Sequence, residues 1–211
     1  MPPHLGPGTA LWVDAAGTLL HPARPVADVY AEFAARHGYP VAPALVAARL
    51  RPAMVRHGAL RRDDPSWSRY WRAVVGEAVD TEEPFEELYA HYARGEAWRV
   101  APGARRCLEV LRDRGVRTAL ISNWDDRLRR TLDELDLVDS FDALLISGEL
   151  GVEKPQPEIF RRAVDQLAVP AERSVMVGDS PESDMAGARA VGAFVIQFGT
   201  EIMEFSSIMD W

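Results

Sequence analysis

Side chains that can do chemistry stand in four short stretches of this sequence, beside apolar runs or helical patterns. The stretches are "DAAGT" (14–18), "SN" (122–123), "EKP" (153–155) and "GDSPESD" (178–184). Taken singly, each is typical of a turn or a helix cap. Together they supply carboxylates, hydroxyl groups and one ammonium, a combination that suits a transferring phosphoryl group.

The acidic side chains of this set can hold a hard cation. Asp14 and Asp179 can share Mg²⁺, which prefers oxygen ligands, and the backbone carbonyl of Ala16 can complete the protein's share. Asp14 can then attack phosphorus as a carboxylate nucleophile and form an aspartyl-phosphate. Thr18 and Ser122 can hold the phosphate oxygens together with neighbouring N–H groups. The pattern therefore predicts a magnesium-dependent site for phosphoryl transfer.

Lysine is used only once in this chain. Of the 24 basic residues, 23 are arginine and only Lys154 is lysine. A chain with this bias has placed its single compact, strongly hydrated cation at one position. We expect Lys154 to neutralise the charge that develops in the transition state.

A parallel sheet would bring the four stretches together. From residue 103 onward the sequence alternates helical patterns with the apolar strands "VRTALIS", "DALLIS", "SVMVGD" and "AFVIQF". Such alternation predicts parallel strands with helices on both faces, and "TALWVD" reads as a further strand of the same sheet. Ligands bind at the carboxyl ends of such strands, so we expect the candidate residues to meet there.

Residues 22–97 have a purely helical pattern. The sequence therefore predicts an α/β core, a doubly wound parallel sheet formed by residues 1–21 and 98–211, with an all-helical domain inserted over 22–97. Pro and Gly residues mark hinges at 17–25 and 98–103. Within the insertion, "TEEPFEELYAHYARG" predicts a helix that opens at Thr81. Trp67, Tyr70 and Trp71 stand at helical spacing, which favours core residues of the bundle over a surface that stacks on substrate.

Composition limits the function further. The net charge is −8 and the sequence has no long basic run, which disfavours nucleic acid and anionic membranes as partners. The sequence has no apolar stretch of about 18 residues, so we expect a cytoplasmic protein. We expect its partner to be a small molecule. We expect the protein to be a monomer or a homodimer. Cys107 lies at helical spacing with Leu111, which favours a packed structural thiol.

The spaced set "DAAGT", "SN", "EKP" and "GDSPESD", with a helical insertion after the first, resembles the haloacid dehalogenase-like (HAD) superfamily of hydrolases with a helical cap. The resemblance covers nearly the whole chain and implies a Rossmann-like core. It implies that Asp14 is the nucleophile and Lys154 the charge-stabilising lysine. The phosphate-binding and metal-binding residues that we expect on this basis are Thr18, Ser122 and Asn123 for phosphate, and Asp14, Ala16, Asp179 and Asp184 for Mg²⁺.

The first motif departs from the family pattern at Ala16. Family phosphatases usually carry a second aspartate there, which protonates the leaving oxygen and then activates water. Positioned proton transfer contributes about 10²- to 10⁴-fold in rate, so its loss should penalise alkoxide leaving groups most. Aryl or acyl phosphates should suffer least. Glu182 or a side chain of the cap could replace this acid, whereas His21 is more typical of a surface loop.

Three family variants also lack that second aspartate. Phosphonoacetaldehyde hydrolases need a lysine in the cap, and this chain has none. Haloacid dehalogenases work without a metal and have neutral residues where this chain has Asp179 and Asp184. The chain most resembles a third subgroup, which lacks the second aspartate and keeps the metal acids. We therefore expect a Mg²⁺-dependent phosphatase acting on a small phosphorylated metabolite. The alternatives are a catalytically silent binding protein and, less favoured, a 2-haloacid dehalogenase.

Overall fold

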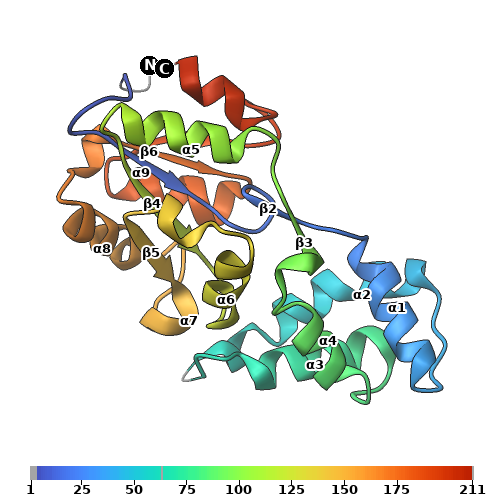
Figure 1. The fold of residues 1–211 in the computed structure, drawn as a ribbon. Coiled ribbons are helices and arrows are strands. Elements are labelled where there is room, and N and C mark those ends of the chain that lie inside the picture. Colours follow the sequence, from blue (N-terminus) through green and yellow to red (C-terminus); the bar gives the residue numbers. More distant parts are fainter. Residues whose placement is uncertain (1–3, 63, 211) are drawn as a thin grey trace. The chain divides into compact units, whose positions relative to one another are not determined.

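The structure, a computed structural model, describes residues 4–62 and 64–210, and the chain folds into two compact units. The first, here called the sheet unit, comprises Met1–His21, Val100–Trp124 and Leu135–Trp211. The second, the helical unit, comprises Pro22–Arg99 and Asp125–Glu134. Figure 1 shows the strands and helices that make up each unit.

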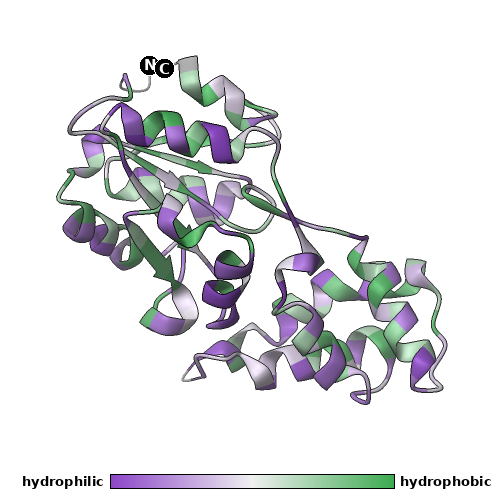
Figure 2. Ribbon diagram, in the orientation of Figure 1, coloured by the Kyte–Doolittle hydropathy of each residue, from purple (hydrophilic) through white to green (hydrophobic). Residues whose placement is uncertain are grey.

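A five-stranded sheet in the order β5-β4-β1-β6-β7 forms the centre of the sheet unit. Its strands are β1 (Ala10–Val13), β4 (Arg117–Ser122), β5 (Ala143–Ile146), β6 (Ser174–Gly178) and β7 (Phe194–Gln197). Every neighbouring pair is parallel. The central strands β1 and β6 are buried along their whole length, and Figure 2 shows the sheet as largely hydrophobic. This burial is expected of a sheet covered on both faces, and it confirms the predicted α/β class.

Helices cover the sheet because each has one apolar face. The helices of this unit are α5 (Ala104–Asp113), α7 (Ser147–Leu150), α8 (Pro157–Leu167) and α9 (Ala186–Ala190). On one face, Phe160 of α8 packs against Trp12 of β1 with the ring centroids 6.0 Å apart. Cys107 is buried in α5, which confirms the packed thiol. Near the C-terminus, a 3₁₀ segment (Phe205–Asp210) buries Phe205 and Ile208.

The helical unit contains α1 (Val26–Arg36), α2 (Pro43–Arg56), α3 (Ser68–Val79), α4 (Phe85–His91) and α6 (Arg127–Glu134). Trp67 and Tyr70 are 4% and 1% exposed, which confirms that they are core residues of this unit. The helix expected to open at Thr81 begins instead at Phe85, and Pro84 occupies its N-cap position. Proline disfavours the helical conformation in the residue that precedes it, so a helix that already includes Glu83 is unfavourable.

Two short strands lie where the hinges were expected. β2 (Leu20–Pro22) and β3 (Trp98–Val100) form a two-stranded sheet of their own. They lie at the points where the chain passes between the units, since the divisions fall after His21 and after Arg99. The expected boundaries at 21/22 and 97/98 are close to these positions.

One segment groups differently from the expected division. The whole of 98–211 was expected in the core, yet Asp125–Glu134 packs with the helical unit. Asp125 is fully buried, and its carboxylate accepts hydrogen bonds from Trp71 Nε1 (2.7 Å) and from Arg127 Nε (2.8 Å) and Nη2 (2.6 Å). The Arg127 guanidinium lies over the ring of Tyr89, 3.6 Å from its centroid. These contacts join α6 to α3 and α4.

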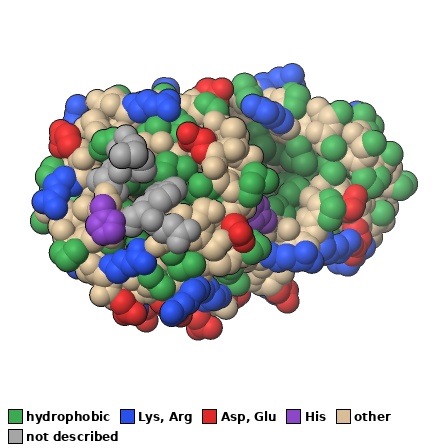
Figure 3. All heavy atoms as spheres, turned by 90° about the horizontal axis from the view of Figure 1, so that it is seen from above, with side chains coloured by type: hydrophobic (Ala, Val, Ile, Leu, Met, Phe, Trp, Pro, Cys, Tyr) green, Lys and Arg blue, Asp and Glu red, His purple; other side chains and the backbone are tan. Residues whose placement is uncertain are grey.

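The surface carries charges of both signs. On the face drawn in Figure 3, acidic and basic side chains are interspersed. Within residues 4–62 and 64–210, the helices are too short or too polar for any of them to cross a membrane.

Replacing Arg127 with alanine should destabilise the protein strongly. The Asp125 carboxylate would remain buried without its ion-pair partner, a change that costs about 3–5 kcal/mol of stability. Arg130→Ala in the same helix is the matched control, because the Arg130 side chain is 65% exposed and its pair with Glu134 contributes only about 0–1 kcal/mol. Denaturant unfolding of both variants measures the difference, and equal losses would contradict this account of the segment.

Candidate active site

The carboxyl end of β1 presents Asp14 in a tight turn. The Asp14 N–H donates to the Val177 carbonyl (2.9 Å), so pairing with β6 continues for one residue beyond the strand. The chain then turns back, and Leu20 N donates to the Ala15 carbonyl (2.8 Å). Gly17 has φ +87°, and a Cβ atom there would lie 2.3 Å from Asp179 Oδ2. Glycine is therefore required for this turn to approach the loop after β6 so closely.

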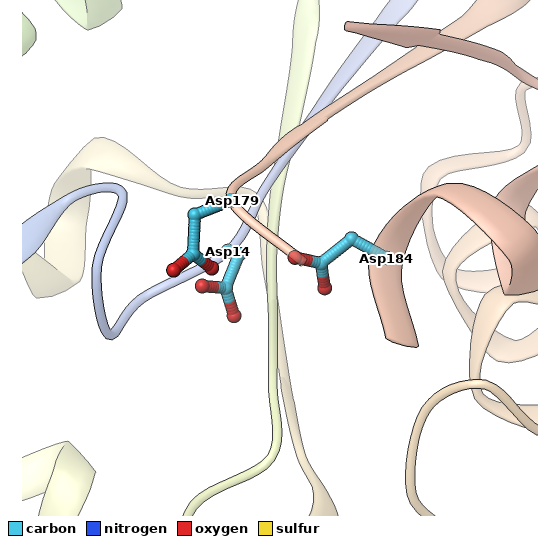
Figure 4. Close-up of side chains that lie close together, drawn as sticks. All are labelled: Asp14, Asp179 and Asp184. Carbon is cyan, nitrogen blue, oxygen red and sulfur yellow. The ribbon is translucent and has the colours of Figure 1, made fainter. Parts of the chain in front are cut away.

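Three of the expected acidic residues meet at this edge of the sheet. Carboxylate oxygens of Asp14, Asp179 and Asp184 all lie within 4.8 Å of one another. Figure 4 shows the carboxyl groups of Asp14 and Asp179 side by side, with that of Asp184 directed toward them from a helical segment. The segment is a single π-helical turn (Pro181–Met185) that leads into α9. The parallel topology thus brings together residues separated by 170 positions in the sequence, from Asp14 to Asp184.

Lys154 completes this cluster. Its ammonium nitrogen lies 2.5 Å from Asp14 Oδ1 and 2.6 Å from Asp184 Oδ1, and the residue is only 3% exposed. Asp184 is held from its other side, because Asp184 Oδ2 accepts a hydrogen bond from Ser180 N (3.0 Å). The one lysine of the chain therefore bridges the carboxylate that follows β1 and the carboxylate of the π-helical turn.

The electrostatics of the cluster favour a further cation. Burial raises the pKa of Asp14 to about 7 even though Lys154 acts to lower it, and the charges of Asp184 and Asp179 add to the rise. Burial and the charge of Asp184 also raise the pKa of Asp179. Burial alone would lower the pKa of Lys154, but the charges and hydrogen bonds of Asp14 and Asp184 raise it, so the ammonium stays protonated. One ammonium does not balance three carboxylates.

The donor set fits a hard divalent cation. Carboxylate oxygens are the ligands that Mg²⁺ and Ca²⁺ prefer, and an added positive charge would offset the repulsion among Asp14, Asp179 and Asp184. Ala16 is exposed on the same turn. Its carbonyl as a further ligand remains a prediction, as does the identity of the metal.

Among the described residues of the sheet unit, two buried hydroxyl groups have no hydrogen-bond partner. They are Thr18 Oγ1 and Ser122 Oγ, and both residues are at most 1% exposed. Buried polar groups in native proteins are nearly always paired, so an unpaired one calls for an explanation. Both residues belong to the expected phosphate-binding set, and a phosphate oxygen would supply the missing partner.

Asn123 has partners that the sequence did not reveal. Its Nδ2 group donates to the Lys154 carbonyl (2.9 Å), and its Oδ1 accepts from the Lys154 N–H (2.8 Å). This side chain was expected to bind phosphate, and that role stays a prediction. A contact across 31 residues has no signature in local sequence patterns.

The positions considered for a replacement acid can also be located. Glu182 is exposed in the π-helical turn. His21, expected in a surface loop, lies on β2 with its ring centroid 6.2 Å from that of Phe198. Neither observation assigns proton transfer to these residues.

Comparison with known proteins agrees with this geometry. The family model "haloacid dehalogenase-like hydrolase" matches residues 9–192. Haloacid dehalogenase-like hydrolase domain-containing protein 3 of Mus musculus is 32% identical over 196 residues, which cover 85% of this chain and 77% of that protein. Phosphoserine phosphatase of Thermus thermophilus is 36% identical over 130 residues, 61% of this chain and 52% of that protein. Further relatives, matched over shorter stretches, are also named as phosphatases.

A solved structure shows the same fold. L-2-haloacid dehalogenase from Xanthobacter autotrophicus superposes with a TM-score of 0.70 at 23% identity, over 90% of this chain and 76% of that chain. At this level of identity the likeness concerns the fold alone. Because the family model spans most of the sequence and its motifs converge on one cluster of side chains, the chain belongs to the haloacid dehalogenase-like hydrolases.

Proposed function

We propose that this hydrolase is a Mg²⁺-dependent phosphatase that acts on a small phosphorylated metabolite through Asp14. The observation that carries the proposal is the Lys154 ammonium held between Asp14 and Asp184, with the third carboxylate of Asp179 in the same cluster. A site that handles a phosphoryl group needs a nucleophile and several positive charges. In this cluster Asp14 can be the nucleophile, Lys154 supplies one positive charge, and the three carboxylates can bind a divalent cation. The relatives named as phosphatases support the same conclusion.

The chain's own residues divide the work as follows. Asp14 Oδ1 is bound by Lys154, so Oδ2 attacks phosphorus, forms the aspartyl-phosphate and displaces the leaving oxygen. Thr18 and Ser122 donate their unpaired hydroxyl groups to the phosphate oxygens. Water then attacks phosphorus, which breaks the bond between phosphorus and Asp14 and releases inorganic phosphate.

Three side chains would hold the cation. Asp14, Asp179 and Asp184 are its carboxylate ligands, and Ala16 offers a backbone carbonyl. When bound, Mg²⁺ would supply positive charge that reduces the repulsion between the anionic nucleophile and the anionic phosphate. Lys154 adds a second, permanent positive charge beside Asp14 and Asp184.

Ala16 determines which substrates react well. A methyl group can neither protonate a leaving oxygen nor activate the water of the second step. Substrates whose leaving group departs without a proton should therefore be preferred. This reasoning points to acyl or aryl phosphates, or to a metabolite that brings its own acid to the site.

Acetyl phosphate and p-nitrophenyl phosphate should be hydrolysed faster than a simple sugar phosphate in the presence of Mg²⁺. The missing general acid is worth about 10²- to 10⁴-fold for the poorer leaving group. Phosphate release is the measurement, and Asp14→Asn, which removes the nucleophile, should abolish it. Absence of metal-dependent release from all three substrates would falsify the proposal.

Ala16→Asp should raise the rate on the sugar phosphate by about tenfold or more, because it restores an acid at the position where the family usually has one. Ala16→Asn is the matched control, since it has the same size and cannot transfer a proton in this way. If wild type is inactive on every substrate and Ala16→Asp gains activity, the chain is instead a silent binding member. If Ala16→Asp and Ala16→Asn change the rate equally, the effect at position 16 does not come from proton transfer.

Mg²⁺ should stabilise the protein more at pH 8 than at pH 5. The pKa of Asp14 is about 7 in the folded, metal-free chain, against 3.8 for an ordinary aspartate. The stabilising effect of this raised pKa is complete below pH 3.8 and is lost as the pH rises through about 7. Bound Mg²⁺ reverses that loss, and at pH 5 it must first displace a proton.

Thermal unfolding with EDTA or with MgCl₂ at the two pH values measures this effect. Asp179→Asn should remove most of the Mg²⁺ effect at pH 8. Glu182→Gln, an exposed carboxylate in the neighbouring turn, should retain it. An equal Mg²⁺ effect at both pH values would contradict the assignment of these acids.

A further inference from the structure

The chain contains one asparagine and one lysine, and these two residues are hydrogen-bonded to each other. Asn123 Nδ2 donates to the Lys154 carbonyl at 2.9 Å, and the Lys154 N–H donates to Asn123 Oδ1 at 2.8 Å. One side-chain amide thus satisfies both backbone groups of a single residue. The arrangement copies the paired bonds that two residues exchange in an antiparallel ladder.

Only an amide of this length can make the contact. A carboxylate would keep the acceptor and lose the donor, while serine is shorter and carries one polar atom. Asn123 is the only asparagine in the sequence. Its side-chain amide is hydrogen-bonded to the backbone of the only lysine.

The backbone of Lys154 must be held in place if its ammonium is to contact two carboxylates. The side chain has four rotatable bonds, and its ammonium must reach Asp14 Oδ1 and Asp184 Oδ1 at the same time, at 2.5 and 2.6 Å. Its backbone lies in the segment before α8, outside any strand or helix. Asn123, in contrast, directly follows β4, whose last residue is Ser122. The two hydrogen bonds of the Asn123 side chain therefore hold the Lys154 backbone at the end of β4.

We infer that Asn123 is a positioning residue, which fixes the backbone of Lys154 so that the ammonium can hold Asp14 and Asp184 together. It also sets the spacing between this ammonium and the hydroxyl group of Ser122, because Ser122 and Asn123 are adjacent. The kinetic part of this inference rests on the proposed phosphatase function. The structural part does not, since the contact concerns the protein alone.

A spectroscopic test follows from the single lysine. Protein labelled with ¹⁵N-lysine gives one backbone amide signal and one side-chain ammonium signal, both from Lys154. In Asn123→Ala the Lys154 amide should exchange with solvent about tenfold faster or more, because it loses its hydrogen-bond acceptor. The ammonium signal should shift or broaden. Gln156→Ala, the same amide-to-methyl change on an exposed side chain of the same segment, should leave both signals unchanged.

Kinetics on the best activated phosphate form the second arm. Asn123→Ala should lower kcat by about 10- to 100-fold, since a misplaced charge weakens transition-state stabilisation. KM should change by less than about threefold, because the phosphate-binding hydroxyls remain. Asn123→Asp retains the acceptor and loses the donor to the Lys154 carbonyl, so its Lys154 amide should stay protected while the ammonium signal shifts and kcat falls. This second variant keeps the test informative if Asn123→Ala does not fold.

The outcomes separate the two proposals. Unchanged Lys154 signals in Asn123→Ala overturn the inference, and a loss of rate with unchanged signals would show that Asn123 acts on the substrate directly. A rise in KM with unchanged kcat overturns it as well, since that would make Asn123 a substrate ligand. If Asn123→Ala alters the Lys154 signals and the wild-type protein has no phosphatase activity, the positioning role is supported and the phosphatase function is refuted.

Discussion

A buried ammonium between two buried carboxylates is the interaction on which the rest of this site depends. Removing charges from water is unfavourable, so Lys154, Asp14 and Asp184 can remain buried only if their geometry is well held. Several features hold it. Asp14 follows a fully buried strand, and Asp184 accepts a hydrogen bond from Ser180 N. The net charge of the cluster still remains negative, which favours the binding of a cation.

Backbone architecture makes such crowding possible. Parallel strands deliver Asp14 and Asp179 to one edge of the sheet, and two glycines allow the approach of neighbouring loops. A Cβ atom at Gly17 would lie 2.3 Å from Asp179 Oδ2, and one at Gly178 would lie 2.3 Å from Asp184 Oδ2. Because both clashes are with side chains of the cluster itself, these glycines serve the site as much as the fold.

Ala16 sets this hydrolase apart from the usual pattern of family phosphatases. Asp14, which we propose as the nucleophile, lies with Lys154 and the other acidic residues, and Ala16 has a methyl group where family phosphatases usually carry an acid. The buried cluster would be unfavourable to maintain if it had no ligand, since Asp14 and Asp179 both have raised pKa values in its absence. In the proposed phosphatase, binding of a cation would reduce the repulsion among these carboxylates. The chemistry of the leaving group then decides whether binding leads to turnover.

The sequence by itself determined the α/β class, the five parallel strands and the four stretches that meet at their ends, because alternating apolar runs and turn residues are local signals. It also placed Trp67 and Tyr70 in a core, and Cys107 in a buried helix face. Other features depend on contacts between distant residues. The helix over Arg127–Glu134 joins the helical unit because Trp71 donates a hydrogen bond to Asp125 and Arg127 lies over the ring of Tyr89, contacts that no local pattern reveals. Only the tertiary structure showed that Asn123 binds the backbone of Lys154 across 31 residues, since a side-chain amide can serve phosphate, solvent or backbone equally well until the fold supplies its partner.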